Sequence, residues 1–201
     1  MCGIVGYVGN DAPQGIIIEG LKKLEYRGYD SAGIAVVSDG EIELRKHVGA
    51  IVNLEKLIGK ENLGGHVGIG HTRWATHGAP SDVNSHPHMS ADNRVALVHN
   101  GTIENYVELR TALEDEGIGF KSDTDSEVAA VLIGKYYNML GDLKAAMDKA
   151  TSEMTGTFAL AAIAADEPDM FVAYRKNAPL IVGKGDGCNF VASDFSALLK
   201  Y

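Results

Sequence analysis

The chain has 201 residues, of which 45% are hydrophobic and 22% charged, the balance of a folded protein rather than a disordered one. The formal net charge is -9, and no run of Lys or Arg is longer than Lys22-Lys23, which argues against a nucleic-acid partner. The first residues lack the features of a signal peptide and no segment approaches a membrane-spanning length. We therefore expect a cytoplasmic protein without membrane contact.

Short apolar runs bounded by glycine or turn residues predict buried strands along most of the chain. The predicted strands are 3–8, 32–37, 67–71, 95–98, 157–164, 170–174, 180–182 and 190–192. The last four follow one another closely, which favours antiparallel neighbours.

Helical spacing of apolar residues predicts amphipathic helices between these strands. They are centred on Ile17 to Leu24, 107–113, 128–140 and 144–154, and residues 196–201 resemble the start of another helix. Before the third helix, Thr124 and Glu127 form a capping-box pattern, and Val128, Leu132 and Met139 share a face. Two sets of strands and two of helices favour one α+β domain with stacked sheets covered by helices.

Cys2 is the first candidate for chemistry. Once the initiator Met is removed, Cys2 has a free α-amine, with a pKa near ~8, beside its thiol, with a pKa near ~8.5. Base and nucleophile then lie on one residue. The alternative is an ordinary buried Cys, which a Met-Cys start alone favours. A retained Met1 would block the amine. The other cysteine, Cys188, gives no disulfide framework and no CxxC spacing.

A polar cluster follows the predicted strand at 67–71. Arg73 can hold a carboxylate by two parallel hydrogen bonds, Thr76 can donate or accept, and Trp74 can exclude water. Such a set suits an amino-acid substrate. Alone, however, the cluster is more typical of a surface Arg and a core Trp.

Two further positions could bind a substrate. Asn100 beside the Gly101 N–H is a plausible oxyanion hole, although Asn-Gly is also a common turn. Asp125, in the first turn of a helix, could bind an ammonium group or complement the helix dipole.

Five histidines raise the question of a metal site. They are His71, His77, His86, His88 and His99. No Cys or carboxylate accompanies them at a ligand spacing, so we predict no metal and expect several of them to hydrogen-bond loops.

Four strings together resemble the glutamine:fructose-6-phosphate amidotransferases (glucosamine-6-phosphate synthases). They are MCGIVG at 1–6, EYRGYDSAG at 25–33, HTRWATHG at 71–78 and HNG at 99–101. The Cys-Gly-Ile start is shared by all N-terminal-nucleophile amidotransferases, whereas the second and third strings resemble this one family. The resemblance implies a glutaminase domain over residues 2–201, with the four-layer αββα fold of N-terminal-nucleophile hydrolases.

The resemblance also implies a role for each matching residue. Cys2 would attack glutamine, and Asn100 and the Gly101 N–H would stabilise the oxyanion. The pocket would comprise Arg73, Trp74, Thr76, His77 and Asp125, with Arg27, Trp74 and His86 assigned to gating or coupling. No cofactor is implied. The sugar-isomerase domains of the full-length enzyme, a homo-oligomer, are absent from this chain.

Two rival interpretations are open at this point. Another amidotransferase of the same class would share the first chemical step but use a different acceptor. A regulatory module that keeps the fold would bind glutamine without releasing ammonia.

Overall fold

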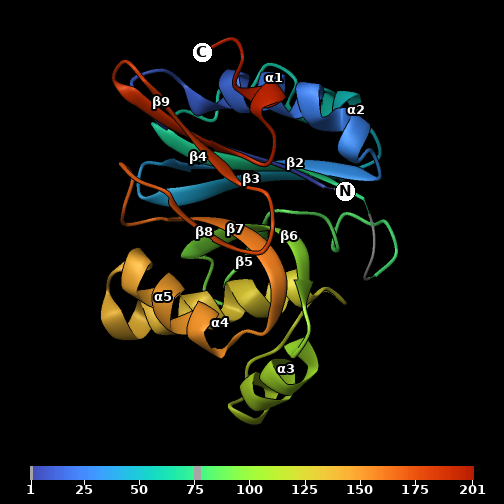
Figure 1. The fold of residues 1–201 in the computed structure, drawn as a ribbon, viewed down its shortest axis with the longest axis vertical. Helices are drawn as coiled ribbons and strands as arrows, with labels where there is room; N and C mark the ends of the chain where they lie inside the picture. Colours follow the sequence, from blue (N-terminus) through green and yellow to red (C-terminus); the bar gives the residue numbers. More distant parts are fainter. Residues whose placement is uncertain (1, 75–77) are drawn as a thin grey trace.

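Two antiparallel sheets lie face to face in the computed structural model, which describes residues 2–74 and 78–201 (Figure 1). The larger sheet has the order β3-β2-β4-β1-β10-β9. Its strands are β1 (Gly3–Gly9), β2 (Ser31–Ser38), β3 (Glu41–Val48), β4 (Val67–Arg73), β9 (Ile181–Gly185) and β10 (Cys188–Ala192). The smaller sheet has the order β5-β6-β7-β8. Its strands are β5 (His88–Met89), β6 (Val95–Ile103), β7 (Gly156–Ala164) and β8 (Val172–Lys176).

Helices cover the outer face of each sheet (Figure 1). On the larger sheet these are α1 (Pro13–Leu24) and α2 (Ile51–Ile58), and on the smaller sheet α4 (Asp125–Leu140) and α5 (Leu143–Glu153). The helix α3 (Tyr106–Asp115) packs against α4, and short 3-10 turns lie at Glu25–Arg27 and Phe195–Ala197. The result is the predicted four-layer αββα arrangement of an α+β fold. No helix in the described part of the chain is both long and apolar enough to cross a membrane.

The central strands are buried on both faces, which explains their continuous apolar runs. In β2, Ile34 and Val36 pack against the helices while Ala35 and Val37 face the second sheet. In β6, Val95 and Leu97 point toward α4 and α5. Because successive side chains alternate between faces, each strand joins two cores, and the register of the sheets is strongly specified.

The structure corrects several local predictions. The strand β3 and the helix α2 were missed: β3 is a partly exposed edge strand rich in charged residues, without an apolar run. Met139 is 69% exposed and does not share the buried face of Val128 and Leu132. The last residues form only a 3-10 turn at Phe195–Ala197 followed by turns, not a further helix.

One half of the predicted capping box before α4 is confirmed and the other half is wrong. Thr124 accepts a hydrogen bond from the Glu127 N–H at 3.2 Å, as predicted. The Glu127 carboxylate instead accepts from the backbone N–H groups of Ser122 and Lys121, two and three residues before the Thr124 N–H that the pattern requires. The turn before α4 is therefore tied to the helix by a buried carboxylate, which positions the Asp125 side chain.

Gly33 connects the larger sheet to the segment that carries His86. A Cβ at Gly33 would overlap the carbonyl oxygen of His86 and lie 2.7 Å from the Lys46 Cβ. The backbone of His86 cannot move aside without disturbing its neighbours. We therefore expect Gly33→Ala to lower the free energy of unfolding, measured by urea denaturation, by about 1–3 kcal/mol. Gly15→Ala is the matched control. Gly15 is exposed in α1 with open space around it, and the substitution should stabilise by about 0.5–1 kcal/mol. Equal stability of the two variants would contradict the predicted overlap.

Candidate active site

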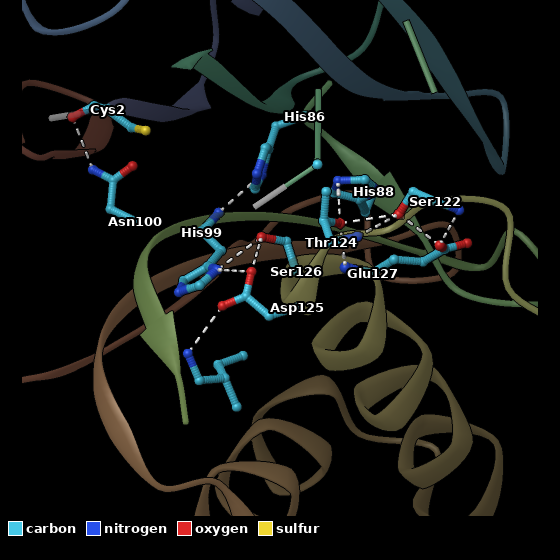
Figure 2. Close-up of polar contacts among 12 residues, drawn as sticks. Cys2, His86, His88, His99, Asn100, Ser122, Thr124, Asp125, Ser126 and Glu127 are labelled. Atoms are coloured by element: carbon cyan, nitrogen blue, oxygen red, sulfur yellow. Dashed lines mark hydrogen bonds and ion pairs between the residues drawn. The ribbon is translucent and has the colours of Figure 1, made fainter. Parts of the chain in front are cut away.

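Strand pairing fixes the position of Cys2 at one end of the larger sheet. Gly3 lies opposite Thr72 and Ile4 opposite His71, so Cys2 sits beside the end of β4. On the other side of β4, Ser31 of β2 pairs with Arg73. The second sheet contributes β6, whose Asn100 faces Cys2 (Figure 2). The nucleophile candidate therefore lies where the two sheets meet.

Both the thiol and the carbonyl of Cys2 are held. The Trp74 N–H donates to Sγ at 3.2 Å, and the thiol lies 3.5 Å from the Trp74 carbonyl oxygen, which can accept from it. The Cys2 carbonyl accepts from Nε of Arg27 and from Nδ2 of Asn100, each at 3.1 Å. Arg27 is in turn paired with Asp194, with N and O 3.4 Å apart. These contacts fix the backbone from which the thiol projects.

Burial raises the pKa of the Cys2 thiol, and the hydrogen bond from the Trp74 N–H only partly offsets this. Nearby Arg73 also acts to lower the pKa, but by less than burial raises it. The thiol is therefore protonated at neutral pH, and any nucleophilic role requires a base.

Asn100 and Gly101 lie inside β6, so the turn interpretation of this dipeptide is wrong. Asn100 is 8% exposed, and its Oδ1 lies 2.9 Å from Nε2 of His71. Gly101 has a φ of 118°, and a Cβ there would overlap the carbonyl oxygen of Thr157. Only glycine suits both the backbone conformation and the close approach of β7.

Arg73 and Asp125 place opposite charges in the same pocket. Both side chains are buried, at 4% exposure, which overturns the surface interpretation of Arg73. Arg73 donates from Nη2 to the Gly78 carbonyl at 3.1 Å, and burial lowers its pKa. Asp125 accepts from the Ile103 N–H at 2.9 Å, and its other oxygen lies 3.4 Å from Oγ of Ser126 (Figure 2). A zwitterionic ligand would meet a fixed cation and a fixed anion here.

Two cavities adjoin Cys2. The first, of about 20 Å³, is lined by residues that include Cys2, Arg73, Trp74, His86, Gly101 and Asp125. The second, of about 290 Å³, is lined by residues that include Cys2, Arg27, Trp74 and Asn100. Cys2, Trp74 and Gly101 border both cavities. Every described residue that the sequence predicted for the site lines at least one of the two. Thr76 and His77 lie outside the described residues.

Trp74 is not a core side chain, contrary to the simpler interpretation of its loop. It is 44% exposed and meets the ring of Tyr29 edge-on, with centroids 5.5 Å apart. An exposed indole bordering both cavities is placed to separate them from solvent.

Four histidines form a buried cluster that the sequence suggested only as loop contacts. His71 stacks on His86, with centroids 4.0 Å apart, and His86 Nδ1 accepts from the His99 N–H at 3.3 Å. His99 Nδ1 lies 2.8 Å from Oγ of Ser126, and His88 Nε2 lies 3.0 Å from Oγ1 of Thr124 (Figure 2). Burial lowers the pKa of His71 to about 3, and the pKa values of His86 and His88 also fall well below the ordinary range. Across residues 2–74 and 78–201, no group of three or more His, Cys, Asp or Glu side chains could hold a metal ion.

The fold and this constellation define an N-terminal-nucleophile type of amidotransferase domain, and comparisons with known proteins agree. Residues 71–200 match the family model of the glutamine amidotransferase domain. The chain is 30% identical to the glutamine phosphoribosylpyrophosphate amidotransferase of B. subtilis, with a TM-score of 0.81 over 98% of this chain and 43% of that one. The chain belongs to the glutamine amidotransferase domain family.

Similar curated proteins are named glutamine-fructose-6-phosphate aminotransferase (isomerizing). One from Caldanaerobacter subterraneus is 54% identical over all 201 residues, and one from Methanosarcina acetivorans is 55% identical over 210 aligned residues. The chain spans 33% and 34% of their lengths. The glutamine aminotransferase class-II domain protein SPO2029 from Silicibacter pomeroyi, at 17% identity and a TM-score of 0.60, shares the fold.

The raised pKa of the thiol predicts slow alkylation of Cys2 in a chain that retains Met1. In a Cys188→Ala background, iodoacetamide should react with Cys2 more slowly than with free cysteine at pH 7.5, because less of the thiol is ionised. Since the pKa is raised, the rate should go on rising above pH ~8.5, where that of free cysteine levels off. Intact mass verifies Met1 and counts the adducts. An apparent pKa below that of free cysteine would contradict the dominance of burial.

Proposed function

We propose that this chain hydrolyses L-glutamine to glutamate and ammonia, with Cys2 as the nucleophile. The observation that carries the proposal is the position of Cys2 on the wall of a pocket that also holds Arg73 and Asp125. From the second sheet, Asn100 donates to the Cys2 carbonyl, and Gly101 lines both cavities beside Cys2. Family membership supports the same chemistry.

Glutamine would bind through its amino-acid end. The Arg73 guanidinium would pair with the α-carboxylate and the Asp125 carboxylate with the α-ammonium, because both are buried and fixed before the ligand arrives. Thr76, His77 and Trp74 would complete the pocket. This orientation directs the side-chain amide toward Cys2.

The reaction would proceed through a thioester. After removal of Met1, the α-amine of Cys2 takes the thiol proton as Sγ attacks the amide carbon. The carbonyl oxygen gains negative charge, which the Asn100 amide and the Gly101 N–H would stabilise. The C–N bond breaks and the amine returns the proton to the departing ammonia. Water then attacks the thioester, releasing glutamate and the thiol.

In a full-length protein, the ammonia would convert fructose 6-phosphate to glucosamine 6-phosphate in fused sugar-isomerase domains. The names of the similar curated proteins and the one-third share of their lengths support this assignment. Trp74 and Arg27, on the larger cavity beside Cys2, would gate the passage of ammonia, and His86 would couple the two halves. We place the protein in the cytoplasm as a homo-oligomer, without an organic cofactor.

Cys2→Ala should abolish ammonia release without unfolding the domain. The side chain is small and only partly buried, so its loss should alter the melting temperature little. The measurement is ammonia production from glutamine beside intact mass, to establish that Met1 is absent. Wild-type chain lacking Met1 should be active and chain retaining it inactive, because the acylated amine cannot act as a base. Unchanged ammonia release by Cys2→Ala would refute the proposed nucleophile.

Asp125→Asn should weaken glutamine binding and affect turnover less. Loss of a charge-assisted interaction of roughly 1.5–3 kcal/mol predicts a rise in KM of about 10- to 100-fold. Asp115→Asn is the matched control: it makes the same charge change at an exposed site at the end of α3, and KM should not move. Similar KM values for both variants would remove Asp125 from the binding site.

A further inference from the structure

We propose that His71 is a positioning residue that holds the Asn100 amide with its N–H groups directed toward Cys2. The proposal rests on the proposed function, in which that amide stabilises the oxyanion. His71 itself would touch neither glutamine nor Cys2. Its role follows from a chain of hydrogen bonds that leaves only one consistent arrangement of protons.

The first step fixes the tautomer of His71. Nε2 lies 2.9 Å from the carbonyl oxygen of His99 and 2.9 Å from Oδ1 of Asn100. A backbone carbonyl can only accept, so Nε2 must carry the proton and donate to it. Nδ1 then carries the lone pair, and within the described residues this buried atom has no hydrogen-bond partner.

The second step fixes the charge. The imidazole is fully buried in β4 and stacked on the His86 ring at an interplanar angle of 20°. Burial and the neighbouring Arg73 both disfavour a cation there, so the ring stays neutral and keeps its single N–H. A neutral, stacked ring on a central strand has little freedom to turn.

The third step transfers this constraint to Asn100. An Nε2–H group beside the amide favours Oδ1 on that side and places Nδ2 toward Cys2, whose carbonyl accepts from it at 3.1 Å. If the amide were flipped, Nδ2–H would face the Nε2–H of His71, and Oδ1 would face the carbonyl oxygen of Cys2. Both contacts would be repulsive. Since one N–H of Nδ2 is occupied by the Cys2 carbonyl, the second is available to an oxyanion at the same site. The His99 carbonyl therefore fixes the tautomer of His71, and this tautomer fixes the orientation of the Asn100 amide.

The experiment compares three variants with the wild type, all with Met1 removed. His71→Leu keeps a side chain of similar volume but removes the N–H donor, so kcat should fall by about 10- to 100-fold. This decrease is no larger than the one expected when a whole oxyanion donor is removed. KM should stay near the wild-type value, because His71 does not touch the amino-acid end of the substrate. His71→Gln returns an N–H near the position of Nε2 and should restore most of kcat. Loss of activity through KM alone, or no rescue by Gln, would overturn the proposal.

His88→Leu is the matched control, since His88 is also buried in the same cluster and hydrogen-bonds Thr124. It should lower the melting temperature yet leave kcat near that of the wild type. An equal loss of kcat in His88→Leu and His71→Leu would show that both act through cluster packing and would overturn the specific role of His71.

A measurement without turnover separates this proposal from the proposed function. Two-dimensional ¹H–¹⁵N NMR of the imidazole groups should show His71 neutral, protonated at Nε2, and unchanged between pH 6 and pH 8. A protonated Nδ1 or an imidazolium would overturn the positioning role even in an active enzyme. If the wild type releases no ammonia, the proposed function fails, and so does the catalytic consequence, while the spectrum still decides the predicted tautomer.

Discussion

The antiparallel pairing of β1 with β4 is the constraint on which the site depends. It pins the N-terminal segment between β4 and β10, so that Cys2 emerges at a fixed point rather than from a frayed terminus. The same pairing places Arg73 and Trp74 at the end of β4, directly beside the thiol. Because β2 pairs with the other side of β4, the segment at 25–33 is drawn to this end of the sheet as well. The proposed nucleophile Cys2, the Arg73 guanidinium and the Trp74 indole therefore owe their positions to the same strand pairing.

Packing between the sheets supplies the other half of the site. The facing side chains include several small residues, among them Ala35, Ala96, Ala159 and Ala161, which allow β6 and β7 to lie close to the larger sheet. At the end of β6 the apolar contacts give way to His99, Asn100 and Gly101. Asn100 can then reach the Cys2 carbonyl across the interface. A substitution that separated the sheets would act on catalysis without altering any residue of the pocket.

The sequence predicted the layers of the fold better than the edge strand and the surroundings of the site residues. Strands buried on both faces carry continuous apolar runs, so β1, β2, β4, β6 and β7 were found; the edge strand β3 has no such run. The residue types alone made Cys2, Arg73, Asn100 and Asp125 chemical candidates. The simpler interpretations that local reasoning favoured for Arg73, Trp74 and the Asn-Gly pair were wrong. Burial of an Arg depends on strands distant in the sequence. The histidine cluster could not be anticipated, because His71, His86 and His99 meet only through the packing of two sheets.

The electrostatics of the site follow from burial as much as from the charges present. Desolvation raises the pKa of Cys2 and lowers the pKa values of His71 and His86, so these groups favour their neutral forms. Among residues 2–74 and 78–201, the thiol contacts the backbone N–H and the carbonyl oxygen of Trp74. In such surroundings a developing oxyanion is stabilised by oriented N–H groups, whose value depends on their orientation being fixed in advance. In the proposed mechanism, neutral histidines suit that purpose, since an imidazolium beside Arg73 would compete with it for the carboxylate of glutamine.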